Sequence, residues 1–148
     1  MDTVDRATRS KIMASVGQKD TGPEIRLRHA LHQRGFRYTL GNRELPGSPD
    51  LVFPRLKAVI FVHGCFWHAH KCKFGKPPSS RKRFWIKKLE DNKIRDKKQI
   101  DTLINMNWRV LVVWECMIKR KNDAAFNKTI EKVSQELISK KRLLGVGR

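Results

Sequence analysis

Apolar and polar positions change period along the chain, and the changes predict an alternation of helices and strands. Residues 21–35 carry apolar side chains at helical spacing and end at a glycine, which predicts a helix. Residues 36–40 alternate apolar and polar and predict a half-buried strand. Residues 51–53 and 58–63 are short apolar runs, which predict two strands joined by a hairpin-like connection.

The second half of the chain repeats the alternation with longer elements. A helical pattern over about residues 81–105 predicts a long helix, and residues 109–116 form a nearly continuous apolar run typical of a strand buried on both faces. Residues 123–141 predict a last helix with an apolar face. The expected buried face of the long helix consists of Trp85, Leu89, Ile100, Leu103 and Ile104. That of the last helix consists of Phe126, Ile130, Val133 and Leu137.

The order of these elements predicts an α/β fold with a mixed central sheet flanked by helices. The length of 148 residues suits a single domain. We therefore expect a basic N-terminal arm over residues 1–20 and one domain over residues 21–148.

The net charge of the chain indicates the class of molecule that it binds. The chain has 33 Lys and Arg against 14 Asp and Glu, a formal net charge of +19, which attracts polyanions such as nucleic acid. No apolar run approaches the roughly 20 residues that span a bilayer, and the polar start of the chain lacks the apolar segment of a secretory signal. These features indicate a cytoplasmic, nucleic-acid-binding protein without a membrane partner.

The cysteines indicate a metal site. Cys65, His70 and Cys72 lie close together in a Lys-rich loop, and Cys116 ends the last predicted strand. Three cysteines do not fit a disulfide framework, whereas three thiolates and one imidazole form the closed tetrahedral set of structural zinc. Buried free cysteines are the alternative, but cysteines that alternate with histidines in a basic loop make it the weaker one. We expect this group, called the metal knuckle below, to pin a loop that has little apolar surface of its own.

A second group of polar residues indicates phosphodiester chemistry. Asp50 begins one strand and His63 ends the next, and His68 is left over if the knuckle takes His70. A carboxylate of this kind can hold Mg²⁺ against phosphate, and a neutral imidazole can deprotonate a water molecule. Taken singly, a turn Asp or a surface His is the commoner explanation, so the argument rests on their combination. Glu24 is a further acidic candidate, for which helix capping is an equally good explanation.

Several of these segments together resemble one family. The stretches ATRSKIMASV, PGSPDLVF, AVIFVHGCFWHAHKC, RKRFWIKKLEDNKIRD and WRVLVVWEC, over about residues 5–118, are similar to the very-short-patch-repair (Vsr) DNA mismatch endonucleases. The resemblance implies a fold related to the type II restriction endonucleases. It also implies Mg²⁺-dependent nicking beside the thymine of a T·G mismatch in double-stranded DNA, which initiates very short patch repair of deaminated 5-methylcytosine. A nick in one strand in turn indicates a monomer, and the expected partners are mismatch-repair proteins and a cognate cytosine-5 methyltransferase.

The resemblance also assigns roles by position. Asp50 matches the metal-bridging carboxylate and His68 the proposed general base, with His63 as a second imidazole of the site. Glu24 matches an acidic residue beside the site. Val62 stands where the best-known relative has Thr, but the family uses the backbone carbonyl there to bind the metal, so the change is tolerable.

The remaining matches concern structure and recognition. The structural zinc ligands of the family match Cys65, His70, Cys72 and Cys116. The residues that wedge into the base stack match Phe66, Trp67 and Met13. The metal knuckle would thus hold a loop that unstacks DNA, which costs least where pairing is already poor. Adjacent aromatics that merely clamp the loop to the sheet are the simpler explanation.

Three functions fit these observations. The first is a Mg²⁺-dependent mismatch-nicking enzyme, the second a zinc-stabilised DNA-binding module without catalysis, and the third a restriction-type endonuclease that cuts perfect duplex. The polar trio Asp50, His63 and His68 favours an enzyme over a pure binding module. The aromatic pair favours mismatched over perfect duplex.

Overall fold

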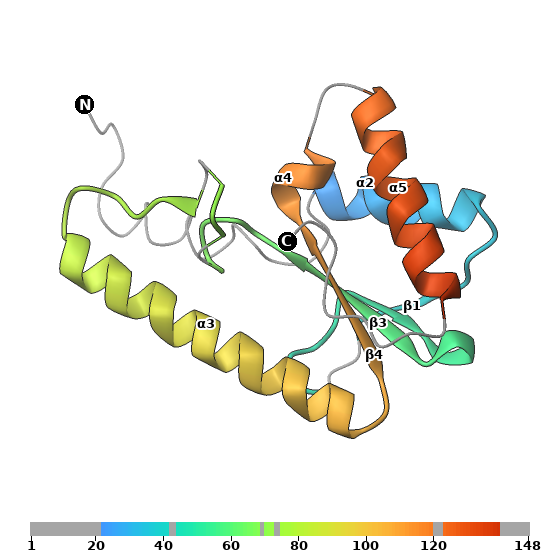
Figure 1. Cartoon of the computed structure of the whole chain (residues 1–148), viewed down its shortest axis with the longest axis horizontal. Helices are drawn as coiled ribbons and strands as arrows, with labels where there is room; N and C mark the ends of the chain where they lie inside the picture. Colours follow the sequence, from blue (N-terminus) through green and yellow to red (C-terminus); the bar gives the residue numbers. More distant parts are fainter. Residues whose placement is uncertain (1–21, 42–43, 69, 73–74, 120–122, 140–148) are drawn as a thin grey trace.

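A four-stranded mixed sheet divides the molecule into two helical layers (Figure 1). The computed structural model describes residues 22–41, 44–68, 70–72, 75–119 and 123–139. The strands lie in the order β1–β2–β3–β4, with the first two pairings antiparallel and the β3–β4 pairing parallel. Their bounds are Thr39–Leu40 for β1, Leu51–Phe53 for β2, Ala58–His63 for β3 and Arg109–Trp114 for β4. The mixed sheet predicted from the sequence is confirmed.

The three predicted helices begin and end near their predicted limits, and the structure adds a short helix, α4 (Glu115–Ile118), that was not predicted. The predicted helices are α2 (Gly22–Gln33), α3 (Lys82–Asn105) and α5 (Asp123–Ile138), and a 3₁₀ turn η1 (Pro54–Leu56) lies between β2 and β3. Figure 1 shows α3 on one side of the sheet and α2, α4 and α5 on the other. Among the described residues, no helix has both the length and the apolar character needed to cross a membrane.

Side chains alternate between the two faces of each strand and therefore pack into two separate cores. Leu51, Ile60 and Leu111 pack with α2, α4 and α5 in one core, whereas Val59 and Val110 pack with α3 in the other. β4 is buried on both faces from Val110 to Val113, as its continuous apolar run predicts. All four residues expected on the buried face of the last helix are buried.

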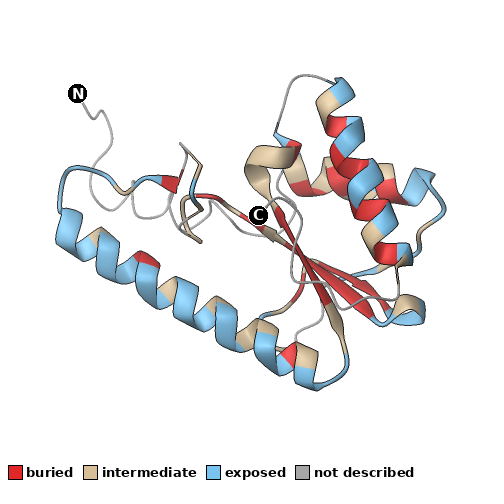
Figure 2. Ribbon diagram, in the orientation of Figure 1, coloured by how far each residue is buried: buried red, intermediate tan, exposed pale blue. Residues whose placement is uncertain are grey.

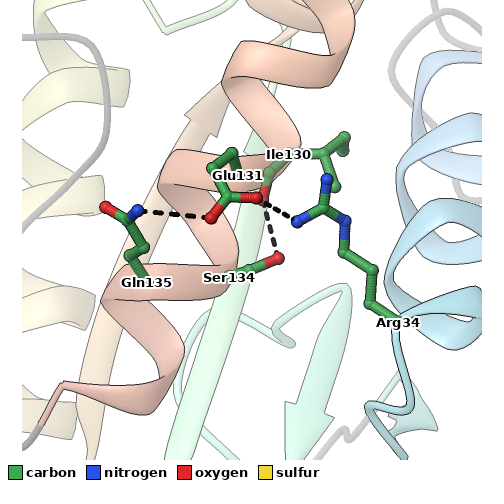
Figure 3. A network of polar contacts seen from close by, with 5 residues as sticks. All are labelled: Arg34, Ile130, Glu131, Ser134 and Gln135. Carbon is green, nitrogen blue, oxygen red and sulfur yellow. Dashed lines mark hydrogen bonds and ion pairs between the residues drawn. The ribbon is translucent and has the colours of Figure 1, made fainter.

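Ion pairs join α2 to α5 across the first of these layers. Figure 3 shows Arg34, which directly follows α2, pointing at Glu131 of α5, with 2.5 Å between Nη1 and Oε2. Gln135 donates a hydrogen bond to the other oxygen of the same carboxylate. The hydrogen bond from Arg34, followed by that from Gln135, lowers the pKa of Glu131. The pair therefore fixes the end of α2 to the middle of α5 at the surface.

The strand predicted over residues 36–40 is shorter than expected. Only the exposed Thr39 and Leu40 pair with β2. Phe36 and Tyr38 instead turn inward and pack edge-on against Phe53.

The last strand is shorter than predicted. β4 ends at Trp114, and Cys116 lies in the first turn of α4. The apolar run continues past the sheet, so composition alone does not reveal where the backbone turns.

The long helix is also less buried than expected. In α3 only Leu89 and Leu103 are buried, and Trp85, Ile100 and Ile104 are half-buried (Figure 2). The sheet core reaches only the C-terminal part of α3, where Ile100, Leu103 and Ile104 pack against it. The N-terminal turns of the helix instead meet the loop that follows β3.

Candidate active site

The parallel pairing of β3 and β4 brings the metal-knuckle cysteines together. His63 pairs with Trp114 at the ends of the two strands, and Cys65 and Cys116 each follow two residues later. The backbone N–H of Cys116 lies at the start of α4, where helix donors lack an intrahelical acceptor, and it donates to Cys65 Sγ at 3.4 Å. The Sγ atom of Cys116 is 3.6 Å from Nδ1 of His70.

The four predicted knuckle residues form a group whose ligand atoms all lie within 4.8 Å of one another, with Cys65 buried and the others half-buried. Burial first, and then the neighbouring thiols of Cys116 and Cys72, raise the pKa of Cys65 to about 12. The thiolate form is therefore disfavoured unless a cation compensates its charge, which a bound divalent ion would do. Burial also lowers the pKa of His70, which favours the neutral imidazole that binds metals. The donor set fits one tetrahedral metal ion.

A second cluster joins the two remaining histidines of this region to an aspartate. The rings of His63 and His68 are stacked, with centroids 3.8 Å apart and an interplanar angle of 3°. Nδ1 of His68 pairs with Oδ2 of Asp96, which comes from α3. The ligand atoms of these three residues also lie within 4.8 Å of one another.

Asp96 is a site residue that the sequence interpretation missed. It lies seven residues after Leu89 and seven before Leu103, so it falls on the stripe of α3 that faces the rest of the molecule. Its side chain is 13% exposed, although α3 otherwise presents a charged, solvated surface. The signal in the sequence that could have indicated Asp96 was a carboxylate on the same face of a basic helix as Leu89 and Leu103.

The two imidazoles have different environments. His63 is buried, with 7% of its surface exposed, and His68 is half-buried. Burial, followed by the neighbouring His68, lowers the pKa of His63 to about 3. His63 is therefore neutral near pH 7 and cannot serve as a cationic phosphate ligand at that pH.

Asp50 approaches the same strand end from β2. Its Oδ2 atom accepts the backbone N–H of Val62 at 2.7 Å. In an extended strand the N–H and C=O of one residue point to the same side, so the carbonyl of Val62 also faces the side on which Asp50 lies. The turn before Asp50 contains Gly47 and Ser48, both with positive φ (77° and 48°). Gln99 of α3 packs closely against Gly47, so that a Cβ atom at position 47 would lie 2.9 Å from Gln99 Oε1.

Glu24 is buried in the first turn of α2 and has Arg28 as an ion-pair partner at 3.8 Å. Among the described residues, neither group of metal-ligand side chains includes Glu24. Thr21, the partner of the expected capping box, lies outside the described residues. The structure thus gives Glu24 a salt-bridged, buried position without joining it to the histidine cluster.

The aromatic residues of the loop form a cluster with α3. Phe66 and Trp67 pack edge-on with ring centroids 5.0 Å apart, and Trp85 of α3 lies 5.3 Å and 6.1 Å from them. The side-chain amide of Asn92 donates to the Trp67 carbonyl at 2.9 Å, which holds the loop next to His68. All three rings are half-buried, so this aromatic cluster is neither a closed core nor a fully exposed surface.

The sequence interpretation placed Trp85 on the core face of α3 and missed its contact with the loop. Two adjacent aromatics in the basic stretch RKRFW were the available signal. Met13, the third predicted wedge residue, lies outside the described residues.

Comparisons with known proteins identify the family of this chain. The sequence model described as DNA mismatch endonuclease Vsr matches residues 1–74, half of the chain. A type II nicking enzyme, V.XorIIP of Xanthomonas oryzae pv. oryzae, is 44% identical over 115 residues, which cover 78% of this chain and 85% of that protein. The DNA mismatch endonuclease Vsr of Escherichia coli K12 is 41% identical over 133 residues, which cover 88% of this chain and 85% of that protein. The type II nicking enzyme V.NmeAIP of Neisseria meningitidis is 39% identical over 120 residues, covering 81% and 86%. The chain therefore belongs to the Vsr family of DNA mismatch and nicking endonucleases, enzymes whose substrate is DNA.

Proposed function

We propose that this endonuclease nicks one strand of double-stranded DNA beside the thymine of a T·G mismatch, with Mg²⁺, and so initiates very short patch repair of deaminated 5-methylcytosine. The observation that carries the proposal is the loop after β3, which carries His68 together with Phe66 and Trp67. His68 stacks on His63 at the end of β3. Asp50 accepts the N–H of Val62, the residue before His63, and Asn92 holds the loop through the Trp67 carbonyl. The same loop would then hold both the catalytic histidine and the aromatic side chains that recognise unstacked DNA.

In this proposal His68 is the general base. The bond between its Nδ1 atom and Asp96 fixes the ring and directs the lone pair of Nε2 outward, toward an attacking water molecule. The Asp96 carboxylate stabilises the imidazolium that forms when His68 takes the proton. His63, neutral and stacked on His68, fixes the face of that ring and excludes water from it.

Asp50 and the backbone carbonyl of Val62 are the proposed Mg²⁺ ligands, since both are oxygen donors on the same side of the strand end. When bound, Mg²⁺ would offset the charge that develops on the phosphate. Glu24 is proposed as an acidic residue beside this site on the strength of the family resemblance, and its burial with Arg28 gives it a structural role as well.

The metal knuckle is proposed to hold structural zinc through all four of its predicted ligands. Its function is to fix the loop that presents Phe66 and Trp67, with Met13 as a third wedge residue. Trp85 joins the proposed wedge because it packs against both aromatics. Side chains of this kind, inserted between base steps, kink and unstack the duplex.

The family resemblance supports further proposals. We propose a fold related to the type II restriction endonucleases, with an N-terminal arm over residues 1–20 and the catalytic domain over residues 21–148. Nicking of a single strand needs one active site, so we propose a monomer that works with mismatch-repair proteins and a cognate cytosine-5 methyltransferase.

A restriction-type activity on perfect duplex is the second candidate, because several similar relatives are named type II nicking enzymes. The two functions are separated by a panel of end-labelled duplexes, each with one mismatch and otherwise identical, with Mg²⁺ or with EDTA. We expect one nick beside the thymine of the T·G duplex, only with Mg²⁺, and little cleavage of matched DNA. Equal nicking of matched duplex would refute the mismatch proposal, and binding without cleavage under all conditions would support a binding module.

A further inference from the structure

Trp114 occupies the position between the metal knuckle and the histidine cluster. It is the last residue of β4, where it pairs with His63 across the parallel register. Its ring stacks on the imidazole of His70, with centroids 4.1 Å apart and an interplanar angle of 17°. The same ring meets the edge of His63 at 5.3 Å and 73°, and that of His68 at 6.4 Å and 70°.

One indole therefore contacts a residue of the metal knuckle and both imidazoles of the histidine cluster. The strand register explains this position, because Trp114 lies opposite His63 and precedes the ligand Cys116 by two residues. An aromatic ring at a strand end has only two side-chain torsions, so it places its neighbours with little freedom of its own.

We propose that Trp114 is a positioning residue through which the metal knuckle fixes the orientation of the His63–His68 pair. A metal ion in the knuckle would hold His70, whose ring stacks on the indole, and the indole in turn contacts both imidazoles. This inference rests on the proposed function, in which His68 is the base.

A simpler role must be distinguished from this one. Trp114 also packs at the margin of the core between the sheet and α3, where any apolar side chain of similar size would fill the space. A filling role would be met by leucine as well as by phenylalanine, whereas a stacking role would be met only by an aromatic ring. Trp108 directly precedes Arg109, the first residue of β4, and packs at the margin of the same core. The Nζ atom of Lys57 lies 4.2 Å from the centroid of the Trp108 ring. Trp108 is the matched control.

The test uses the variants Trp114→Leu, Trp114→Phe and Trp108→Leu of the full chain. All three should retain the metal content of the wild-type protein, since no ligand is removed. Removal of the indole changes nearby imidazole chemical shifts by itself, so the geometry of the pair is read from the NOEs between the ring protons of His63 and His68, which need no activity. We expect these NOEs to weaken or vanish in Trp114→Leu and to keep their wild-type strength in Trp114→Phe and Trp108→Leu. Unchanged His63–His68 NOEs in Trp114→Leu would overturn the inference.

Nicking supplies the second measurement. We expect the single-turnover rate of Trp114→Leu on T·G duplex to fall about 10- to 100-fold, as small misplacement of a reacting group does, while the Kd for that duplex changes less than about threefold. Trp114→Phe should recover most of the rate, and Trp108→Leu should nick like the wild-type protein. Equal losses in Trp114→Leu and Trp108→Leu, or no recovery with phenylalanine, would reduce Trp114 to a core residue. If the wild-type protein nicks no duplex, the proposed function fails, and the NOEs between the His63 and His68 rings still decide whether Trp114 orders the histidines.

Discussion

His68 draws its proposed role from a partner far away in the sequence. Its Nδ1 atom is paired with Asp96, which is 28 positions further along the chain, and its ring lies flat on His63. Asp50, the other essential residue in the proposal, is fixed by the backbone N–H of Val62. At the scale of single residues, each candidate group is oriented by one specific contact, so single substitutions can test each role.

Asp96→Asn keeps the shape of the side chain but removes the charge that would stabilise protonated His68. We expect the nicking rate to fall about 10²- to 10⁴-fold, with little change in affinity for mismatched duplex. Single-turnover kinetics and a binding titration check the two parts. Asp101→Asn, which alters an exposed ion pair with Lys97 on the same helix, should leave the rate unchanged and is the control. A normal rate in Asp96→Asn would remove this residue from the mechanism.

Asp50→Asn can still accept the Val62 N–H, so the turn and the strand should survive. The substitution removes the negative charge that would bind Mg²⁺, and we expect nicking to be abolished at any Mg²⁺ concentration. Binding to mismatched duplex should be retained or strengthened, because a negative charge near phosphate is lost. Nicking within about tenfold of the wild-type rate would contradict the assignment of Asp50 as a metal ligand.

At the scale of elements, the ends of β3 and β4 and the first turn of α4 build the metal knuckle, and α3 supports the loop that follows β3. Trp85, Asn92 and Asp96 lie along one side of α3 and contact the aromatic cluster or His68 in turn. This loop has few apolar residues of its own, so we expect its position to depend on α3 and on metal binding at the knuckle.

The metal knuckle makes a separate prediction. We expect about one tightly bound zinc ion per chain, retained under mild chelation that removes Mg²⁺. Cys116→Ser should lose the metal and unfold at a lower temperature, because metal binding contributes to the free energy of folding. Metal analysis and thermal melts of the two proteins check this. Wild-type protein that purifies without metal, yet is stable and active, would exclude the site.

The aromatic cluster is tested by Trp67→Ala. The variant should keep its metal and lose preference for mismatched over matched duplex, because a stack worth about 1–3 kcal/mol per base is removed. Competition binding with both duplexes measures the preference, and a thermal melt measures the packing contribution of the half-buried ring. A melting temperature more than about ten degrees lower, with the preference intact, would show that Trp67 serves packing rather than recognition.

At the scale of the whole molecule, a net charge of +19 sets the strength of non-specific DNA binding. Twelve of the 33 Lys and Arg lie in residues 71–105, which comprise the loop before α3 and α3 itself, and α3 is largely exposed (Figure 2). We therefore expect the charge to determine affinity for any duplex, and the aromatic cluster to determine the preference for mismatched over matched duplex.

Non-specific affinity should fall steeply with salt, because each neutralised phosphate releases a counterion. We expect the slope of log K against log salt on matched duplex to be the same for the wild-type protein and Trp67→Ala. Binding titrations at several salt concentrations measure both slopes. A clearly shallower slope in Trp67→Ala would mean that this loop also contributes phosphate contacts.

The sequence by itself determined the order of helices and strands, the two-sided burial of β4, and the four residues of the metal knuckle. These follow from local periodicity and from ligand types at short spacing, which the chain carries without reference to its fold. Only the tertiary structure decided that Asp96 holds His68, that Trp85 joins Phe66 and Trp67, and that Trp114 contacts both His70 of the metal knuckle and the His63–His68 pair. These contacts join residues far apart in the chain, and the parallel register of β3 with β4 and the position of α3 bring them together. No local pattern encodes such distances, because they depend on how whole elements pack.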